Sequence, residues 1–240
     1  MKTALLMSSS RMGAMGYLEH ADAQIHTILQ KRPLKVLFVP FAGVSFSFDA
    51  YEAMVRPVFE RLGYEFASIH QAGDPRAAVA GADAIAVGGG NTFALLKRMY
   101  DAGIVELIKA RVAHEGVPYI GWSAGTNVAT ASIRTTNDMP IVQPPTFRGI
   151  GLTHFQINPH FIPGKPAGHN GESREERLQE FLTINPGEHV VAIKEGTALL
   201  ITGDKGRLLG EDALWFKDPA TVEPIRAGAE FDLSMIKGGA

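Results

Sequence analysis

The sequence predicts an α/β fold in which helices cover both faces of a mainly parallel sheet. In the first 130 residues, short apolar runs alternate with longer amphipathic segments. The apolar runs are continuous, as in strands that are buried on both faces. Repeated β-α-β units of this kind bring parallel strands side by side and place helices on the two faces of the sheet. After residue 130 the pattern changes to short strand-like runs separated by turns.

The strands and helices predicted for the first half of the chain follow from these apolar runs and amphipathic segments. In the amphipathic segments, apolar residues recur with the helical period of about 3.6 positions. The predicted strands are residues 4–7, 34–39, 65–69, 82–87 and 117–122, and the predicted helices are residues 16–29, 48–62, 74–80, 91–100 and 105–114.

The sequence of the C-terminal third predicts antiparallel strands in addition to the parallel ones. Its strand-like runs are residues 155–157, 190–193, 198–202, 207–209 and 213–216, and a helix is predicted at 174–183. The segment Gly203-Asp204-Lys205-Gly206 is typical of a hairpin turn. We expect these strands to extend the main sheet or to form a small flanking sheet. Because no linker-like composition interrupts the chain, we expect one domain over residues 1–240.

Composition excludes several classes of protein. The net charge of the 240 residues is −2 and the basic residues are scattered, so nucleic acid is not an expected partner. The absence of cysteine excludes disulfides and thiolate metal sites. The apolar core of the first ten residues is too short for a signal peptide, and no apolar run approaches the roughly 18–20 residues of a membrane span. We expect a cytoplasmic protein with no membrane partner.

The most informative motif is Gly121-Trp122-Ser123-Ala124-Gly125. It follows a predicted strand and leads into a helix-compatible segment, which is the context of a Gly-x-Ser-x-Gly nucleophile elbow. The glycines allow a tight turn, and the serine hydroxyl is then exposed at the strand tip. The N–H groups that begin the next helix can stabilise a developing oxyanion. The motif therefore predicts a serine nucleophile, although a plain glycine-rich turn would have the same pattern.

A serine nucleophile needs a base, and histidine is the usual one. His160 is the strongest candidate because it lies just past the strand-like run 155–157, behind the rigid Pro159. A carboxylate should orient the imidazole. Asp138, in a polar loop after the elbow, and Glu195, at the end of a late strand, are both candidates, and sequence alone does not choose between them.

A second glycine-rich turn, Gly88-Gly89-Gly90-Asn91, follows the predicted strand 82–87. It lacks the sequence of a phosphate-binding loop. We expect Gly89 or Gly90 to supply an oxyanion-hole N–H opposite Ser123, with Asn91 capping the next helix.

The histidines of the region that contains His160 do not predict a metal site. The spacing of His154, His160 and His169 matches no helical or ribbon-type ligand pattern, so we expect neither a metal nor another cofactor.

Several motifs occur together in this chain: Gly88-Gly89-Gly90-Asn91, Ile120-Gly121-Trp122-Ser123-Ala124-Gly125, Ile133-Arg134-Thr135-Thr136-Asn137-Asp138-Met139-Pro140, Gln156-Ile157-Asn158-Pro159-His160-Phe161 and Gly168-His169-Asn170-Gly171-Glu172-Ser173-Arg174. As a set they resemble the aspartyl dipeptidases of the S51 family of serine peptidases, over roughly residues 1–217.

The resemblance implies a fold and an activity. The fold would be a class I glutamine-amidotransferase-like, flavodoxin-like sandwich, with serine in place of that group's cysteine. The activity would be hydrolysis of dipeptides with an N-terminal aspartate, Asp-X, with no cofactor. Ser123 and His160 match the nucleophile and base of the family. The family's third member is divided between positions that match Asp138 and Glu195, and Asp138 is our first choice. Gly89 or Gly90 and Ala124 would bind the oxyanion.

Recognition of aspartate requires a fixed cation, and a guanidinium binds a carboxylate bidentately. Arg174, after a glycine-rich loop, is the first choice, with Arg134 and Arg148 as weaker ones. The alternatives are a related S51-type hydrolase of β-aspartyl or cyanophycin-derived peptides, an esterase with the same elbow, and a non-catalytic binder of acidic small molecules. The sequence does not indicate the oligomeric state.

Overall fold

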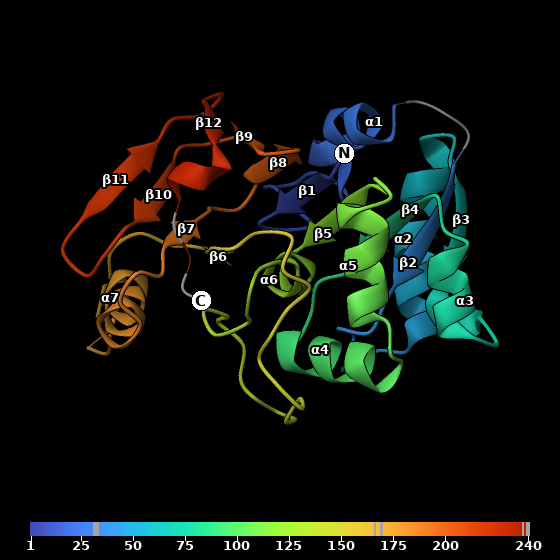
Figure 1. The fold of residues 1–240 in the computed structure, drawn as a ribbon, viewed down its shortest axis with the longest axis horizontal. Helices are drawn as coiled ribbons and strands as arrows, with labels where there is room; N and C mark the ends of the chain where they lie inside the picture. Colours follow the sequence, from blue (N-terminus) through green and yellow to red (C-terminus); the bar gives the residue numbers. More distant parts are fainter. Residues whose placement is uncertain (31–33, 166, 169, 237, 239–240) are drawn as a thin grey trace.

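The computed structural model describes residues 1–30, 34–165, 167–168, 170–236 and 238. An eight-stranded sheet forms its centre, and a four-stranded sheet lies beside it (Figure 1). The parallel strands of the large sheet, coloured blue to green, lie to the right of the small sheet in this view. The chain therefore has the α/β architecture that the sequence predicts.

The large sheet has the strand order β12-β9-β8-β1-β5-β4-β2-β3. Its parallel strands are β1 (Thr3–Met7), β2 (Lys35–Val39), β3 (Glu65–Ser68), β4 (Ala84–Val87) and β5 (Tyr119–Trp122). Its antiparallel strands are β8 (Ala198–Thr202), β9 (Lys205–Leu209) and β12 (Glu230–Asp232). The direction changes at β1, which pairs in parallel with β5 and antiparallel with β8.

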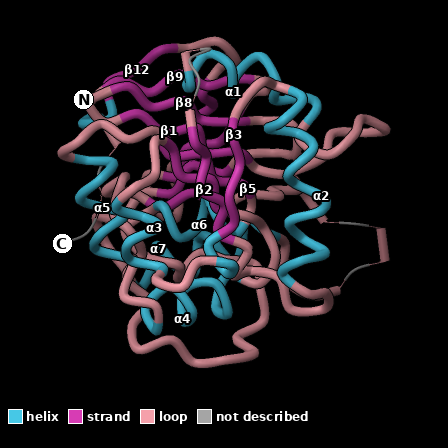
Figure 2. Tube along the Cα trace, turned by 90° about the vertical axis from the view of Figure 1, so that its right-hand side faces the viewer, coloured by secondary structure: helices cyan, strands magenta, loops and turns pink. Residues whose placement is uncertain are grey.

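Helices cover both faces of the parallel strands. One face packs against α1 (Asp22–Leu29) and α2 (Phe48–Arg61), and the other against α3 (Pro75–Ala80), α4 (Thr92–Asp101), α5 (Val105–Ala113) and α6 (Ala124–Ala129). Figure 2 shows α2 on one side of the strands and α3 and α5 on the other.

Alternate residues of each parallel strand belong to different cores. In β1, Ala4 and Leu6 lie in the core formed with α3 to α6, whereas Leu5 and Met7 pack with α1 and α2. Successive side chains of a strand point to opposite faces, so a strand between two helix layers must be apolar at every position. This explains the continuous apolar runs in the sequence.

The small sheet has the order β11-β10-β7-β6. Its strands are β6 (Gln156–Asn158), β7 (Val190–Ala192), β10 (Ala213–Phe216) and β11 (Val222–Ile225), and α7 (Arg174–Ile184) packs on it. Within this small sheet, β6 and β7 pair in parallel, and the β7–β10 and β10–β11 pairs are antiparallel. The C-terminal third thus both extends the main sheet and builds a flanking one, which were the two expectations.

Some boundaries differ from those expected. The helix predicted at 16–29 begins only at Asp22, because Leu18 has a left-handed φ of 56° and a 3₁₀ turn (Glu19–Ala21) intervenes. The other 3₁₀ turns are Ile69–Gln71 and Leu233–Met235. Strands β11 and β12 were not predicted, since both are edge strands with few buried residues and β11 contains Pro224. Among the described residues, no helix combines the length and apolarity needed to cross a membrane.

Candidate active site

The site lies where the carboxyl ends of β1, β4 and β5 meet. Met7 at the end of β1 is in register with Trp122, and Val87 at the end of β4 is in register with Gly121. Strand β8 runs the other way, and its first residue, Ala198, pairs with Met7. The segments after β1, β4 and β5 therefore meet the segment before β8 at one edge of the sheet, where α/β sheets bind ligands.

Ser123 occupies a sharp turn between β5 and α6. Its φ of 53° and ψ of −112° are uncommon for a residue with a Cβ. Its N–H donates to the carbonyl of Met7 at 3.1 Å. A Cβ at Gly125 would lie 2.1 Å from the carbonyl oxygen of Val87, so α6 can begin this close to β4 only with glycine there. This is the strand, turn and helix geometry of a nucleophile elbow.

His160 lies between Ser123 and Glu195. Its Nε2 is 2.9 Å from the Ser123 Oγ, and its Nδ1 is 2.9 Å from the Glu195 Oε1. The histidine side chain is 38% exposed and that of Glu195 64% exposed. In this arrangement the imidazole can accept the serine proton while the carboxylate fixes the ring and balances its charge.

The small sheet brings His160 beside Glu195. His160 follows β6 and Glu195 follows β7, and the two strands are parallel neighbours. Beyond them, the Phe161 N–H donates to the Ile193 carbonyl at 3.1 Å. Ser8, after β1, ties both segments to the large sheet, because its Oγ accepts from the His160 N–H at 2.8 Å and donates to the Ile193 carbonyl at 3.0 Å.

Asp138, our first choice to orient His160, has other partners. Its carboxylate accepts from the Thr92 N–H at 2.7 Å and from the Thr136 hydroxyl at 3.2 Å. These contacts hold it at the N-terminus of α4, where the helix dipole favours a negative charge. The role expected of Asp138 stays a prediction that this geometry does not favour: Glu195, the alternative, is the carboxylate that contacts His160. The reason is the β6–β7 pairing, which local sequence patterns do not reveal.

The predicted oxyanion glycines lie next to Ser123. A Cβ at Gly89 would be 3.0 Å from the Cβ of Ser123, so the two backbones are close. Gly90 has a φ of 135°, and a Cβ there would be 2.3 Å from the carbonyl oxygen of Ala42. Ala124 is the first residue of α6, directly after the serine. Gly89 and Ala124 thus lie beside Ser123, and Gly90 lines the same cleft.

Asn91 has a structural role at the same turn. Its side-chain oxygen accepts from the Ala94 N–H at 3.0 Å and caps α4. Its amide donates to the Met139 carbonyl at 2.9 Å. Asn91 therefore joins the glycine turn to the loop that contains Asp138.

A cleft of about 390 Å³ opens in front of the serine. Its lining residues are Ser9, Ser10, Arg11, Tyr17, Phe46, Tyr51, Met54, Gly89, Gly90, Trp122, Ser123, His160 and Glu195. The Trp122 Nε1 donates to the Tyr17 hydroxyl at 2.9 Å, and the Tyr51 hydroxyl donates to the Gly89 carbonyl at 2.9 Å. Burial raises the pKa of Tyr17 and of Tyr51, so both hydroxyls remain neutral. Tyr17, Tyr51 and Trp122 thus give the cleft an aromatic lining with neutral hydroxyls.

Arg11 contributes a positive charge to this cleft. It is exposed, and its Cζ lies 5.6 Å from the centre of the Tyr17 ring. Sequence reasoning did not single out Arg11, Tyr17 or Tyr51. For Arg11, the signal available in the sequence was its position. Residues 8–11 directly follow β1, just as Ser123 directly follows β5.

A second pocket, of about 300 Å³, lies beside the Asp138 loop. Its polar lining includes Asp138, Asn158, Arg174 and Arg177. Burial and the neighbouring Arg177 lower the pKa of Arg174, whereas the Asp138 carboxylate raises it. An arginine remains charged despite such a shift. The Asn158 Oδ1 is buried and has no hydrogen-bond partner among the described residues.

Of the two weaker arginine candidates, Arg134 lines the same pocket as Arg174 and Arg148 does not. Arg134 forms an ion pair with Glu188, hydrogen-bonds Asn185 and stacks 5.1 Å from the Phe181 ring centre, so its guanidinium is engaged in structure. Arg148 is exposed and lines neither pocket.

The histidines considered for metal binding do not come together in the part of the chain that the structure describes. His154 Nε2 contacts the Ile236 carbonyl, and His160 contacts Ser123 and Glu195. His169 lies outside the described residues.

A model of peptidase family S51 matches residues 4–209. The chain belongs to peptidase family S51. It is similar to Peptidase E of Actinobacillus pleuropneumoniae serotype 5b, with 48% identity over 97% of this chain and 100% of that protein. It is also similar to Peptidase E of Haemophilus influenzae strain Rd, with 50% identity over 88% of this chain and 96% of that protein. As a member of family S51, the protein is a peptidase.

Two solved structures share the fold of this S51 member. One is a putative Peptidase E from Listeria monocytogenes, with a TM-score of 0.64, 23% identity and coverage of 95% of this chain and 100% of that chain. The other is a peptidase from an acI-B1 actinobacterium, with a TM-score of 0.68, 18% identity and coverage of 96% of both chains. Both the resemblance to family S51 and the predicted fold class are confirmed.

Proposed function

We propose that this S51 peptidase hydrolyses dipeptides with an N-terminal aspartate, Asp-X, through an acyl-enzyme on Ser123. One observation supports the proposal above all: the contacts from Ser123 through His160 to Glu195 form the proton-transfer chain of a serine hydrolase. The elbow conformation of Ser123 supports the same role.

The first half-reaction makes the acyl-enzyme. His160 removes the Ser123 proton as the Oγ attacks the scissile carbonyl, and Glu195 stabilises the imidazolium. Backbone N–H groups of Ala124 and of Gly89 or Gly90 receive the negative charge on the carbonyl oxygen. His160 then protonates the leaving amine. In the second half-reaction His160 activates a water, which releases aspartate from Ser123.

The polar pocket suits the aspartyl residue. Arg174 offers a charged guanidinium for the substrate's side-chain carboxylate. Asp138 and the buried oxygen of Asn158 offer acceptors for the free ammonium of the N-terminus. Asn137 links this pocket to the catalytic loop, because its amide donates to the Pro159 carbonyl at 2.9 Å, directly before His160.

The aromatic cleft suits the leaving residue. It contains His160, which must reach the leaving amine, and apolar side chains such as Phe46 and Met54 at its rim. Arg11 offers a cation for the C-terminal carboxylate that a dipeptide presents one residue after the scissile bond. An apolar residue in the X position would therefore fit best.

A substrate panel tests the proposal. Purified protein is incubated with Asp-Leu, Asn-Leu, Glu-Leu, β-Asp-Leu and β-Asp-Arg, and free amino acids are measured by chromatography. Release is expected to be fastest from Asp-Leu and much slower from Asn-Leu, since Asn-Leu keeps the shape and loses the charge. Preferred cleavage of β-linked peptides would instead identify a β-aspartyl or cyanophycin-type hydrolase, and binding without cleavage of any peptide would identify a non-catalytic binder.

A further inference from the structure

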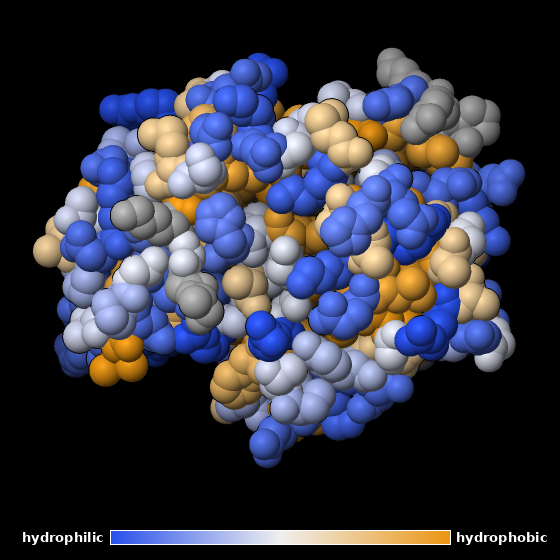
Figure 3. All heavy atoms as spheres, viewed as in Figure 1, coloured by the Kyte–Doolittle hydropathy of each residue, from blue (hydrophilic) through white to orange (hydrophobic). Residues whose placement is uncertain are grey.

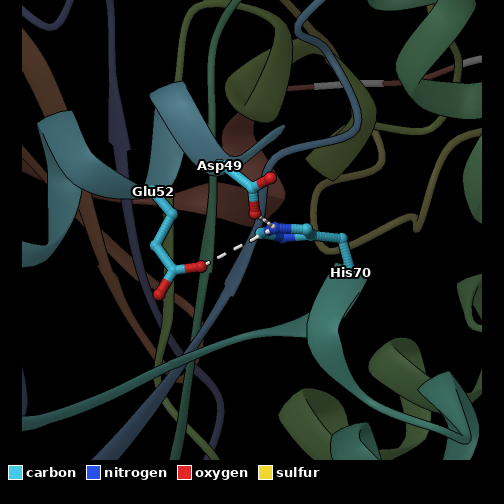
Figure 4. A group of neighbouring side chains, drawn as sticks. All are labelled: Asp49, Glu52 and His70. Carbon is cyan, nitrogen blue, oxygen red and sulfur yellow. Dashed lines mark hydrogen bonds and ion pairs between the residues drawn. The ribbon is translucent and has the colours of Figure 1, made fainter. Parts of the chain in front are cut away.

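A second group of polar side chains lies outside the catalytic cleft, between α2 and the turn after β3. Asp49 and Glu52 are three positions apart on α2, and His70 comes from the 3₁₀ turn Ile69–Gln71. The His70 Nε2 is 2.9 Å from the Asp49 Oδ1 and 3.7 Å from the Glu52 Oε2. Figure 4 shows the three groups pointing toward one point. The ligand atoms all lie within 4.8 Å of one another.

Glu52 has a buried oxygen that lacks a hydrogen bond within the described residues. The residue is 6% exposed, and its Oε1 is held by Arg56. Its Oε2 is buried and has no hydrogen-bond partner among the described residues, although it points toward His70. A buried carboxylate oxygen without a hydrogen bond is costly, so a cation bound at that position would stabilise it.

Each of the three side chains also contacts a further polar residue. The Ser68 Oγ lies 2.7 Å from the His70 Nδ1. Arg56 holds the other oxygen of Glu52, and Gln71 hydrogen-bonds Asp49. Outer partners of this kind orient metal ligands, and a histidine whose Nδ1–H is donated to a neighbour presents a free lone pair on Nε2.

We propose that Asp49, Glu52 and His70 bind a divalent transition metal, with Zn²⁺ as the preferred ion. One imidazole nitrogen and two carboxylate oxygens are ligands that Zn²⁺ accepts, and water can complete its tetrahedron because Asp49 is 79% exposed at the side chain. Mg²⁺ is disfavoured, since it prefers oxygen ligands in an octahedron.

The site is separate from the catalytic cleft but shares a helix with it. Tyr51, between Asp49 and Glu52 in sequence, faces the other way and hydrogen-bonds the Gly89 carbonyl. A metal on one side of α2 would thus fix the helix that supports the glycine turn on the other. The inference concerns binding and does not depend on which peptide the enzyme cleaves.

Calorimetric titration with Zn²⁺ tests the inference. Wild type, Asp49→Asn, His70→Asn and His160→Gln proteins are compared near neutral pH, with circular dichroism to confirm folding. His160→Gln is the matched control, because it removes any zinc binding at the catalytic histidine. We expect one equivalent bound by wild type and by His160→Gln, and affinity lowered by more than about tenfold in Asp49→Asn and His70→Asn.

A further variant probes the outer partners. Ser68→Ala should keep the ligands and weaken binding by about 10- to 100-fold. Absence of zinc binding in wild type would overturn the inference. So would binding that Asp49→Asn and His70→Asn leave intact, or binding that only His160→Gln removes.

Discussion

The Glu195 carboxylate contacts the His160 ring at 2.9 Å, although 35 positions separate the two residues in the chain. Parallel pairing of β6 with β7 accounts for the contact, because each residue follows one of these strands. The hydrogen bond leaves the other ring nitrogen facing Ser123. Orientation of His160, the proposed base, thus depends on a small sheet outside the main parallel core.

Glu195→Gln should lower kcat for Asp-Leu. The amide keeps the size of the side chain, but it cannot balance the charge of an imidazolium and can stabilise the wrong tautomer. We expect a loss on the order of 10²-fold or more, with little change in KM. Steady-state kinetics on wild type and variant give the answer. An unchanged kcat would remove Glu195 from the mechanism.

Asp138→Asn should act mainly on substrate binding. Asp138 contacts Thr92 and Thr136 rather than His160, and it lines the proposed aspartate pocket. We expect KM for Asp-Leu to rise more than kcat falls, since the variant loses an acceptor for the substrate ammonium. The same kinetics, run beside Glu195→Gln, separate the two carboxylates. A kcat loss equal to that of Glu195→Gln, at unchanged KM, would contradict this division.

Arg174→Ala should lose selectivity for aspartate. The substitution leaves the side-chain carboxylate of the substrate without its proposed partner in a half-buried pocket. This loss costs about 2 kcal/mol or more, which is at least roughly 30-fold in kcat/KM for Asp-Leu. Activity on Asn-Leu should change much less, because that substrate has no side-chain charge. Arg148→Ala is the matched control, since Arg148 is exposed and lines neither pocket. Equal losses on Asp-Leu and Asn-Leu would mean that Arg174 does not read the carboxylate.

Gly125→Ala should destabilise the fold. The new Cβ would lie 2.1 Å from the Val87 carbonyl oxygen, which belongs to the rigid backbone of β4. Forcing an atom into a packed site costs about 1–3 kcal/mol, and the melting temperature falls by roughly 2–4 °C for each kcal/mol. Gly73→Ala is the control, because nothing lies within 4 Å of its Cβ position. Equal melting temperatures of the two variants would refute the expected clash.

The capping box of α7 should make stability depend on pH. The Ser173 N–H donates to the Glu176 carboxylate at 2.6 Å, and this bond, with Lys165, lowers the pKa of Glu176. A lowered carboxyl pKa adds stability above the unfolded pKa of about 4.3, and that stability is lost as pH falls through the folded pKa. Glu176→Gln should therefore melt below wild type near neutral pH, and the gap should close on acidification. A gap that does not change with pH would contradict this linkage.

Local patterns were enough to predict the parallel sheet and to select Ser123 and His160, which the structure places in contact. The continuous apolar runs indicated strands that are buried on both faces. The Ser123 elbow motif lies within five consecutive residues. His160 could be placed because it follows a recognisable strand and a rigid proline. Each of these signals lies within a short stretch of chain.

The remaining features depend on contacts between distant segments. Glu195 could not be preferred to Asp138 without the β6–β7 register, and both are loop carboxylates in the sequence. Tyr17 and Tyr51 belong to helical or turn segments whose apolar neighbours suggest only core packing. Their hydroxyls meet Trp122 and Gly89 because α1 and α2 pack on the face of the sheet that ends at the nucleophile.

The most direct test of the account is free aspartate released from Asp-Leu by wild type and by Ser123→Ala, measured side by side on folded proteins. The account predicts rapid release by wild type and loss of nearly all release in the variant. Substantial release by Ser123→Ala, or none from Asp-Leu by folded wild type, would contradict it.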